Sequence, residues 1–213
     1  MKPVDVAEFY RRLAEANPEP RSELAYSNTY QLLVAVVLSA QATDAGVNRA
    51  TAALFRRVET PAQMLELGED GLRGHIRTIG LFNAKARTVM ELSRLLVEAH
   101  GGEVPREREA LEALPGVGRK TANVVLNIAF GEPTIAVDTH VFRVGNRTGL
   151  ARGRTPEAVE RKLGKATPDR YRLHAHHWLI LHGRHACKAR KPACPTCVVA
   201  DLCAWGKKAR PAG

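Results

Sequence analysis

A chain of 213 residues is long enough for one large domain or two small ones, each with a buried core. Charged residues make up 25% and hydrophobic residues 45% of it, which excludes an intrinsically disordered protein. The formal net charge of +10 favours a polyanionic partner, with nucleic acid ahead of an anionic membrane surface.

The N-terminal segment argues against export and membrane insertion. Residues 1–5 lack the apolar core of a secretory signal. The apolar run Leu32–Leu38 is far shorter than the roughly 20 residues that a membrane span needs. We therefore expect an intracellular protein without a membrane partner, cytoplasmic and associated with the nucleoid if the source is bacterial.

The first half of the chain carries helical periodicity throughout. Residues 6–13 predict an amphipathic helix that ends at Asn17, and residues 29–39, apolar on nearly every side, predict a buried one. The further expected boundaries are Thr43 or Asp44 as a cap, Thr60 as the start of a capping box, Gly68 and Gly80 as the ends of two short helices, Asn83 as the cap of a longer helix, and Gly101 as its end.

The second half continues in the same way, and no stretch shows sustained alternation. The expected boundaries are a helix from Glu107 that breaks at Pro115, a second helix through Phe130 with Gly131 as its stop, and helices that begin at Asp138, Thr155 and Pro168, the last reaching His182. Residues 134–137 are the only candidate strand. The sequence predicts an all-helical fold without internal repeats.

The turn between the helices on either side of Pro115 is a candidate anion site. Pro115 is excluded from a helix interior, and Gly116 and Gly118 allow a tight turn. We expect the backbone N–H groups of Val117, Gly118 and Arg119 to remain unpaired at the positive end of the second helix, where a phosphate could bind. The turn alone is equally consistent with a plain loop between packed helices.

Two ionisable residues near this turn are candidates for chemistry. Lys120 lies in the first turn of the second helix, where the helix dipole, neighbouring cations and partial burial would favour a neutral, nucleophilic amine. A phosphate contact beside Arg119 is the alternative role for this lysine. Asp138 follows an apolar approach and is expected to cap a helix, which leaves one carboxylate oxygen for proton transfer or for stabilising positive charge.

All four cysteines lie near the C-terminus with the spacing C-x6-C-x2-C-x5-C, namely Cys187, Cys194, Cys197 and Cys203. In a reducing compartment this grouping indicates a metal and not disulfides. The spacing alone is compatible with zinc, which is the commoner metal, or with a [4Fe–4S] cluster. Residues 188–191 form a basic loop between the first two cysteines, either a second DNA contact or a solvated run of charges.

Taken together, LPGVGRKTANVV, AVDTHV and the cysteine spacing resemble the endonuclease III family of base-excision glycosylases, within the helix-hairpin-helix superfamily. The likeness extends to LLVAVVLSAQATD, TIGLFNAKA and HHWLILHGR. It implies that Lys120 is the nucleophile, that Asp138 is the essential aspartate and that the cysteines hold a [4Fe–4S] cluster. Gln41 and Leu81 match positions that enter the gap left by a flipped nucleotide. The expected DNA contacts are therefore Gln41, Leu81, Gly116, Val117, Gly118, Arg119 and Lys191.

The resemblance also implies an architecture and an activity. We expect a two-lobed fold in which residues 22–132 form a helical domain that ends with the hairpin, residues 1–21 and 133–213 form the cluster domain, and the active site lies in the cleft between them. The implied activity is that of a monomeric, bifunctional DNA glycosylase and AP lyase, which removes oxidised pyrimidines from double-stranded DNA and cleaves at abasic sites.

Other activities remain open at this stage. A non-catalytic DNA-binding or damage-sensing module and a lyase restricted to abasic sites are the two alternatives. Adenine removal is disfavoured because Val37 stands where adenine-specific relatives carry a carboxylate, and because Lys120, which they lack, is present. Most of the histidines in these motifs, namely His140, His176, His177 and His182, are expected to be core residues.

Overall fold

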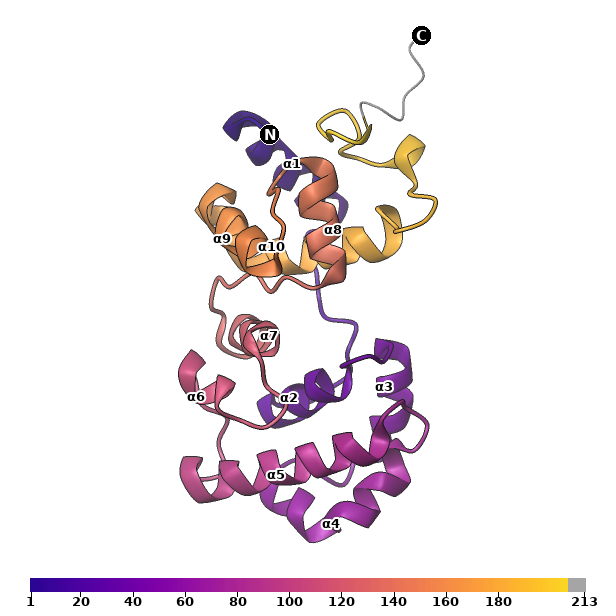
Figure 1. The fold of residues 1–213 in the computed structure, drawn as a ribbon, viewed down its shortest axis with the longest axis vertical. Helices are drawn as coiled ribbons and strands as arrows, with labels where there is room; N and C mark the ends of the chain where they lie inside the picture. The colour runs from indigo at the N-terminus through magenta and orange to yellow at the C-terminus, as the bar shows by residue number, and fades with distance from the viewer. Residues whose placement is uncertain (207–213) are drawn as a thin grey trace. The chain divides into compact units, whose positions relative to one another are not determined.

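A computed structural model describes residues 1–206, apart from the side chain of Pro3, and every regular element in that range is helical (Figure 1). Backbone contacts divide the chain into two compact units. We call Ser22–Gly131 the hairpin unit, and Met1–Arg21 with the chain from Glu132 onward the cysteine unit. None of the described helices is both long and apolar enough to cross a membrane. The prediction of an all-helical fold is confirmed. The candidate strand at residues 134–137 is extended but pairs with no other strand within residues 1–206.

The hairpin unit is built around its first helix, α2, which is buried from Tyr30 to Leu38. Helix α2 packs against α5 and α7, and α4 and α5 lie side by side (Figure 1). The helices of this unit are α2 (Thr29–Leu38), α3 (Asp44–Thr51), α4 (Pro61–Ile76), α5 (Phe82–His100), α6 (Arg108–Glu112) and α7 (Arg119–Phe130).

Side-chain caps fix the N-termini of three helices in this unit, α2, α3 and α4. The side chain of Thr43 accepts a hydrogen bond from the Gly46 N–H, and Thr60 forms the predicted capping box with Gln63. The predicted break at Gly68 is confirmed, because its φ of 75° and ψ of 164° interrupt the helical backbone within Pro61–Ile76. The predicted cap at Asn83 is wrong, because α5 begins at Phe82. Asn83 therefore lies inside the first turn of α5 and does not cap it.

The cysteine unit packs the N-terminal helix against the C-terminal half of the chain. The side chains of Phe9 and Tyr10 on α1 are fully buried, and the Tyr10 hydroxyl lies 3.0 Å from the Thr167 hydroxyl. The indole N–H of Trp178 donates to the carbonyl of Asn17 at 2.8 Å. The helical elements are α1 (Pro3–Ala16), α8 (Thr139–Thr148), α9 (Pro156–Ala166), α10 (Asp169–Leu181), the π-helical turn η1 (His182–Ala186) and the 3-10 turn η2 (Cys194–Thr196).

Candidate functional site

The hairpin, residues 114–118, is a tight turn in which any side chain at Gly116 would be strained. Gly116 has a φ of 75°, and a Cβ there would lie 2.5 Å from Thr88 Cγ2 and 3.2 Å from Val37 Cγ1. The hairpin thus packs directly on α5 and on the last turn of α2. Gly118 is the N-cap of α7 and offers no side-chain hydrogen bond, so the first amide groups of α7 have no intrahelical acceptor.

One of the expected anion-binding amides is already paired. The Val117 N–H donates to the carbonyl of Leu114 at 3.1 Å, and the Val117 side chain is buried. The prediction that this N–H is unpaired is wrong, because it closes the turn that gives the hairpin its shape. Gly116, Gly118 and Arg119 are exposed, so the outer surface of the hairpin is accessible to a ligand.

Lys120 is exposed in the first turn of α7, where no other described side chain bonds to it. The partial burial that we expected for this lysine is absent.

Asp138 has the capping role that its position predicts. Its Oδ1 accepts the N–H groups of His140 at 2.9 Å and Val141 at 2.8 Å, at the start of α8. The apolar approach, Ile135 to Val137, is buried and fixes the backbone that leads to the cap. Because both amides bond to one oxygen, Oδ2 remains available for another partner.

Backbone strain coincides with three of the predicted DNA contacts. Gln41, Leu81 and Lys191, with φ values of 54°, 61° and 48°, are the non-glycine residues of positive φ in the described chain. A left-handed conformation costs such residues about 1–2 kcal/mol. All three are exposed, Leu81 at 61%, although leucine is usually buried. These side chains are therefore held outward at an energetic cost.

The four cysteines surround one cavity, which Val199 and Trp205 also line. Within residues 1–206, no three His, Cys, Asp or Glu side chains are arranged to hold a single metal ion. A four-iron cluster keeps its cysteine ligands further apart than a zinc ion does, because irons and sulfides stand between them. Four thiols around one cavity are the donor set that a [4Fe–4S] cluster needs, so the residues present fit that group.

Comparison with known proteins decides the family. The model of the HhH-GPD superfamily of base excision DNA repair proteins matches residues 34–169, and that of the iron-sulfur binding domain of endonuclease III matches residues 187–203. Endonuclease III of Escherichia coli strain K12 is 58% identical over 201 residues, which are 94% of this chain and 95% of that protein. The chain belongs to the endonuclease III family.

Similar solved structures agree with this assignment. A trapped endonuclease III–DNA covalent intermediate, an estranged-adenine complex, has a TM-score of 0.91 and 44% identity, with 98% of each chain covered. A thermostable thymine-DNA glycosylase has a TM-score of 0.84 and 25% identity, over 96% of this chain and 97% of that one. The predicted family, the helix-hairpin-helix fold and the iron–sulfur cofactor are confirmed.

Polar groups lie close to three of the four cysteine sulfurs. The Gly206 N–H lies 3.3 Å from Cys203 Sγ, the Arg147 guanidinium lies 3.8 Å from Cys187 Sγ, and His182 Nε2 lies 3.8 Å from Cys197 Sγ. Backbone N–H and guanidinium donors of this kind stabilise cluster thiolates. Burial raises the pKa of the Cys197 thiol.

Two functional candidates in the cysteine unit were missed at the level of sequence. Arg143 and Arg147 lie one turn apart on α8, and both bond to the segment around Cys187. Arg143 donates to the carbonyls of Cys187 at 2.9 Å and Gly183 at 2.7 Å. The two arginines are four residues apart on the helix that Asp138 caps, so they lie on the same face of it. This spacing is the one signal in the sequence that could have indicated a shared role.

The histidines are mostly core residues, as expected. His176, His177 and His182 are buried, and His176 Nδ1 lies 2.9 Å from the carbonyl of Ala136. His140 is half-buried, and its Nδ1 lies 3.1 Å from the Arg143 guanidinium.

Proposed function

We propose that the protein is a bifunctional DNA glycosylase and AP lyase that removes oxidised pyrimidines from double-stranded DNA. Membership of a base excision repair family supports this function. The observation that carries it is the exposed amine of Lys120, which directly follows the hairpin and has no protein partner among the described residues. A family member has been trapped as a covalent intermediate with DNA, which requires a nucleophile in that protein.

In the proposed reaction, Lys120 Nζ attacks C1′ of the damaged nucleotide. The bond between C1′ and the base breaks, and the base leaves with a proton. The amine then gives up one proton, the C1′–O4′ bond breaks as O4′ takes a proton, and Nζ and C1′ are left joined as a protonated Schiff base. Loss of a C2′ proton then expels the 3′ phosphate by β-elimination, and water releases the lysine. Asp138 assists proton transfer and stabilises the positive charge through Oδ2, since Oδ1 is engaged by the helix cap.

Access to C1′ requires that the nucleotide leave the base stack. We propose that Leu81 enters the duplex as an apolar wedge and that Gln41 fills the vacated space with an amide able to pair with the opposite base. Their exposure and left-handed backbones support this assignment, because a side chain already held outward has less conformational freedom to lose on binding.

The remaining DNA contacts are to phosphates. We propose that the exposed hairpin residues Gly116, Gly118 and Arg119 bind one phosphate at the N-terminus of α7, and that Lys191 binds another from the basic loop. Val117 contributes by closing the turn. We expect the protein to act as a monomer in the cytoplasm, and the cluster, when bound, to brace the basic loop.

Borohydride trapping tests the nucleophile. With a duplex that contains thymine glycol, the wild-type protein and Lys165→Ala, which alters an exposed lysine at the end of α9, are expected to form a covalent adduct. Lys120→Ala is expected to form none. An adduct from Lys120→Ala, or no adduct from the wild type, overturns the proposed chemistry.

The same duplex separates the alternative functions. Release of free thymine glycol identifies a glycosylase, whereas a lyase restricted to abasic sites cleaves only a duplex whose base is already missing. A damage-sensing module binds both duplexes and cleaves neither.

A further inference from the structure

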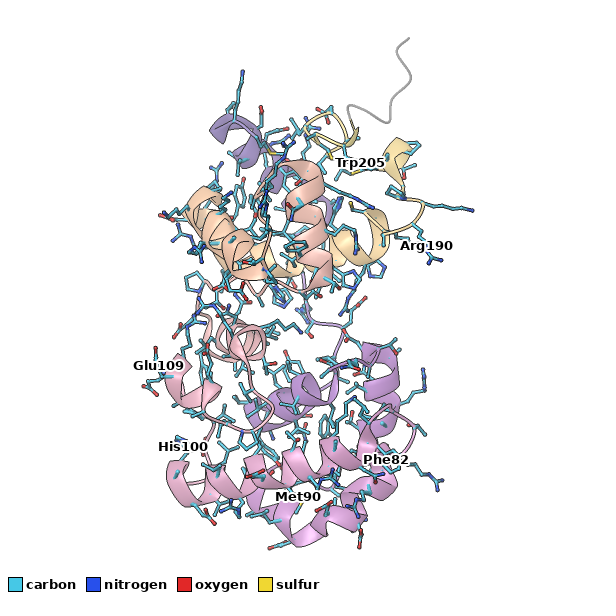
Figure 2. The ribbon with its side chains drawn as sticks, viewed as in Figure 1. Phe82, Met90, His100, Glu109, Arg190 and Trp205 are labelled. Atoms are coloured by element: carbon cyan, nitrogen blue, oxygen red, sulfur yellow. The ribbon has the colours of Figure 1, made fainter. Side chains whose placement is uncertain are left out.

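Arg147 contacts the basic loop through its backbone. The guanidinium lies in the last turn of α8 and donates to the carbonyl of Lys188 at 2.6 Å and to that of Ala189 at 2.8 Å. The same group stacks over the indole of Trp205, with 5.2 Å between Cζ and the ring centroid. Trp205 and Arg190, an exposed residue of this loop, are labelled in Figure 2.

Arg147 also joins the two ends of the cysteine segment. Its guanidinium lies 3.8 Å from Cys187 Sγ, and its backbone carbonyl accepts the Trp205 N–H at 3.2 Å, just beyond Cys203. The neighbouring carbonyl of Thr148 accepts the Ala204 N–H at 3.0 Å. The C-terminal turn of α8 thus fixes both the first and the last cysteine.

The basic loop has few other backbone anchors. The N–H groups of Lys188 and Ala193 both donate to the carbonyl of Ala186 at 3.0 Å. Lys191 lies between these two bonds in sequence. It is exposed, and its φ of 48° is a strained, left-handed conformation for a lysine. The bonds from Arg147 are additional restraints on the Lys188 side of the loop.

Charge alone does not account for an arginine at this position. Lys188, Arg190 and Lys191 are already cationic, so a fourth cation beside them is repelled. The guanidinium instead supplies geometry, because its planar fork spans two carbonyls while one face stacks on an aromatic ring. A lysine at this position carries the same charge but cannot make both contacts.

We propose that Arg147 is a positioning residue for DNA binding, which holds the backbone of the basic loop so that Lys191 meets a phosphate of the duplex. The inference rests on the proposed function only in that DNA is the ligand. The chemistry recognised is the phosphodiester backbone, without regard to base sequence.

The test measures the affinity of the holoprotein for an undamaged duplex as a function of salt. Arg147→Lys retains the net charge, yet it is expected to reduce the slope of log affinity against log salt by about 0.9, the value for one lost phosphate contact. The defect is then about 3.5-fold larger at 50 mM than at 200 mM salt. Arg161→Lys, at an exposed position of α9, is the matched control and should leave the slope unchanged.

Coupling to Lys191 distinguishes positioning from a general structural role. Lys191→Gln is expected to cause the same loss of slope, and Arg147→Lys added to it should have no further effect. The proposal is overturned if the losses of slope in the two variants are independent and additive. It is also overturned if Arg147→Lys retains full cluster absorbance and shows an unchanged slope.

A second variant covers the case in which Arg147→Lys fails to retain its cluster. Trp205→Leu removes the stacking partner and leaves both loop carbonyl bonds in place. It is expected to give a smaller loss of slope that again vanishes in the Lys191→Gln background, and persistence of the loss there refutes the proposal. Because this duplex is undamaged, failure of borohydride trapping would refute the enzymatic chemistry and leave this result untouched.

Discussion

Asp138 is expected to combine two roles that substitution can separate. Oδ1 caps α8 by accepting two amides, at 2.9 Å and 2.8 Å, and Oδ2 is left for the reaction. Asparagine caps a helix about as well as aspartate, because its amide oxygen accepts the same N–H groups. Asp138→Asn therefore preserves the cap and removes the charge, whereas Asp138→Ala removes both.

The structure gives magnitudes for these two changes. Loss of the cap in Asp138→Ala is expected to cost about 1–2 kcal/mol, because two amides at the start of α8 lose their acceptor. In Asp138→Asn only the interaction of the charge with the helix dipole is lost, about 0.5 kcal/mol. For a chain of this length, about 1 kcal/mol corresponds to a change of about 2–4 °C in Tm.

Thermal unfolding and single-turnover base release measure the two roles. Asp138→Asn is expected to unfold within about 2 °C of the wild type and to react about 10²–10⁴ times more slowly, whereas Asp138→Ala loses both stability and rate. If Asp138→Asn is as unstable as Asp138→Ala, the cap does not work as described. If Asp138→Asn reacts at the wild-type rate, the carboxylate has no role in proton transfer or charge stabilisation.

Three other features can be tested by substitution. Gly116→Ala should lower Tm by about 4–8 °C, from about 2 kcal/mol of backbone strain and collision with Thr88, whereas Gly118→Ala, with open space around its Cβ, should change it little; equal effects would contradict this account. Leu81→Asn, which tolerates a left-handed backbone, should retain Tm but slow base release at least about tenfold through loss of the wedge, so an unchanged rate argues against insertion. Burial, with a smaller contribution from the charge of His174, lowers the pKa of His177 to about 4, below its unfolded value of about 6.5. As the pH falls, the unfolded state therefore takes up the proton first, and the free energy of unfolding falls by about 2 kcal/mol from pH 7 to 5. In His177→Gln, Tm should depend less on pH. If the curves of Tm against pH for this variant and the wild type are parallel, the role of His177 is refuted.

The sequence by itself determined the features that depend on neighbouring residues. The capping box at Thr60 and the caps at Thr43 and Asp138 were predicted because a cap bonds to amides two or three residues away. The stop at Gly131 followed from the preference of glycine for a left-handed backbone, and the structure gives it a φ of 69°. The cysteine spacing indicated a metal, although only the family resemblance chose iron and sulfur over zinc.

Tertiary structure decided the features that depend on distant contacts. The exposure of Lys120 and the left-handed backbone of Leu81 could not be predicted, because helical periodicity reports neither solvent access nor strain imposed by packing. Pairing of the Val117 N–H with Leu114 depends on the shape of the folded hairpin. Arg147 shows the limit most clearly, since its bonds reach residues more than 40 positions along the chain. Only the folded cysteine unit brings that guanidinium to the loop, because side-chain spacing along one helix carries no record of its partners elsewhere.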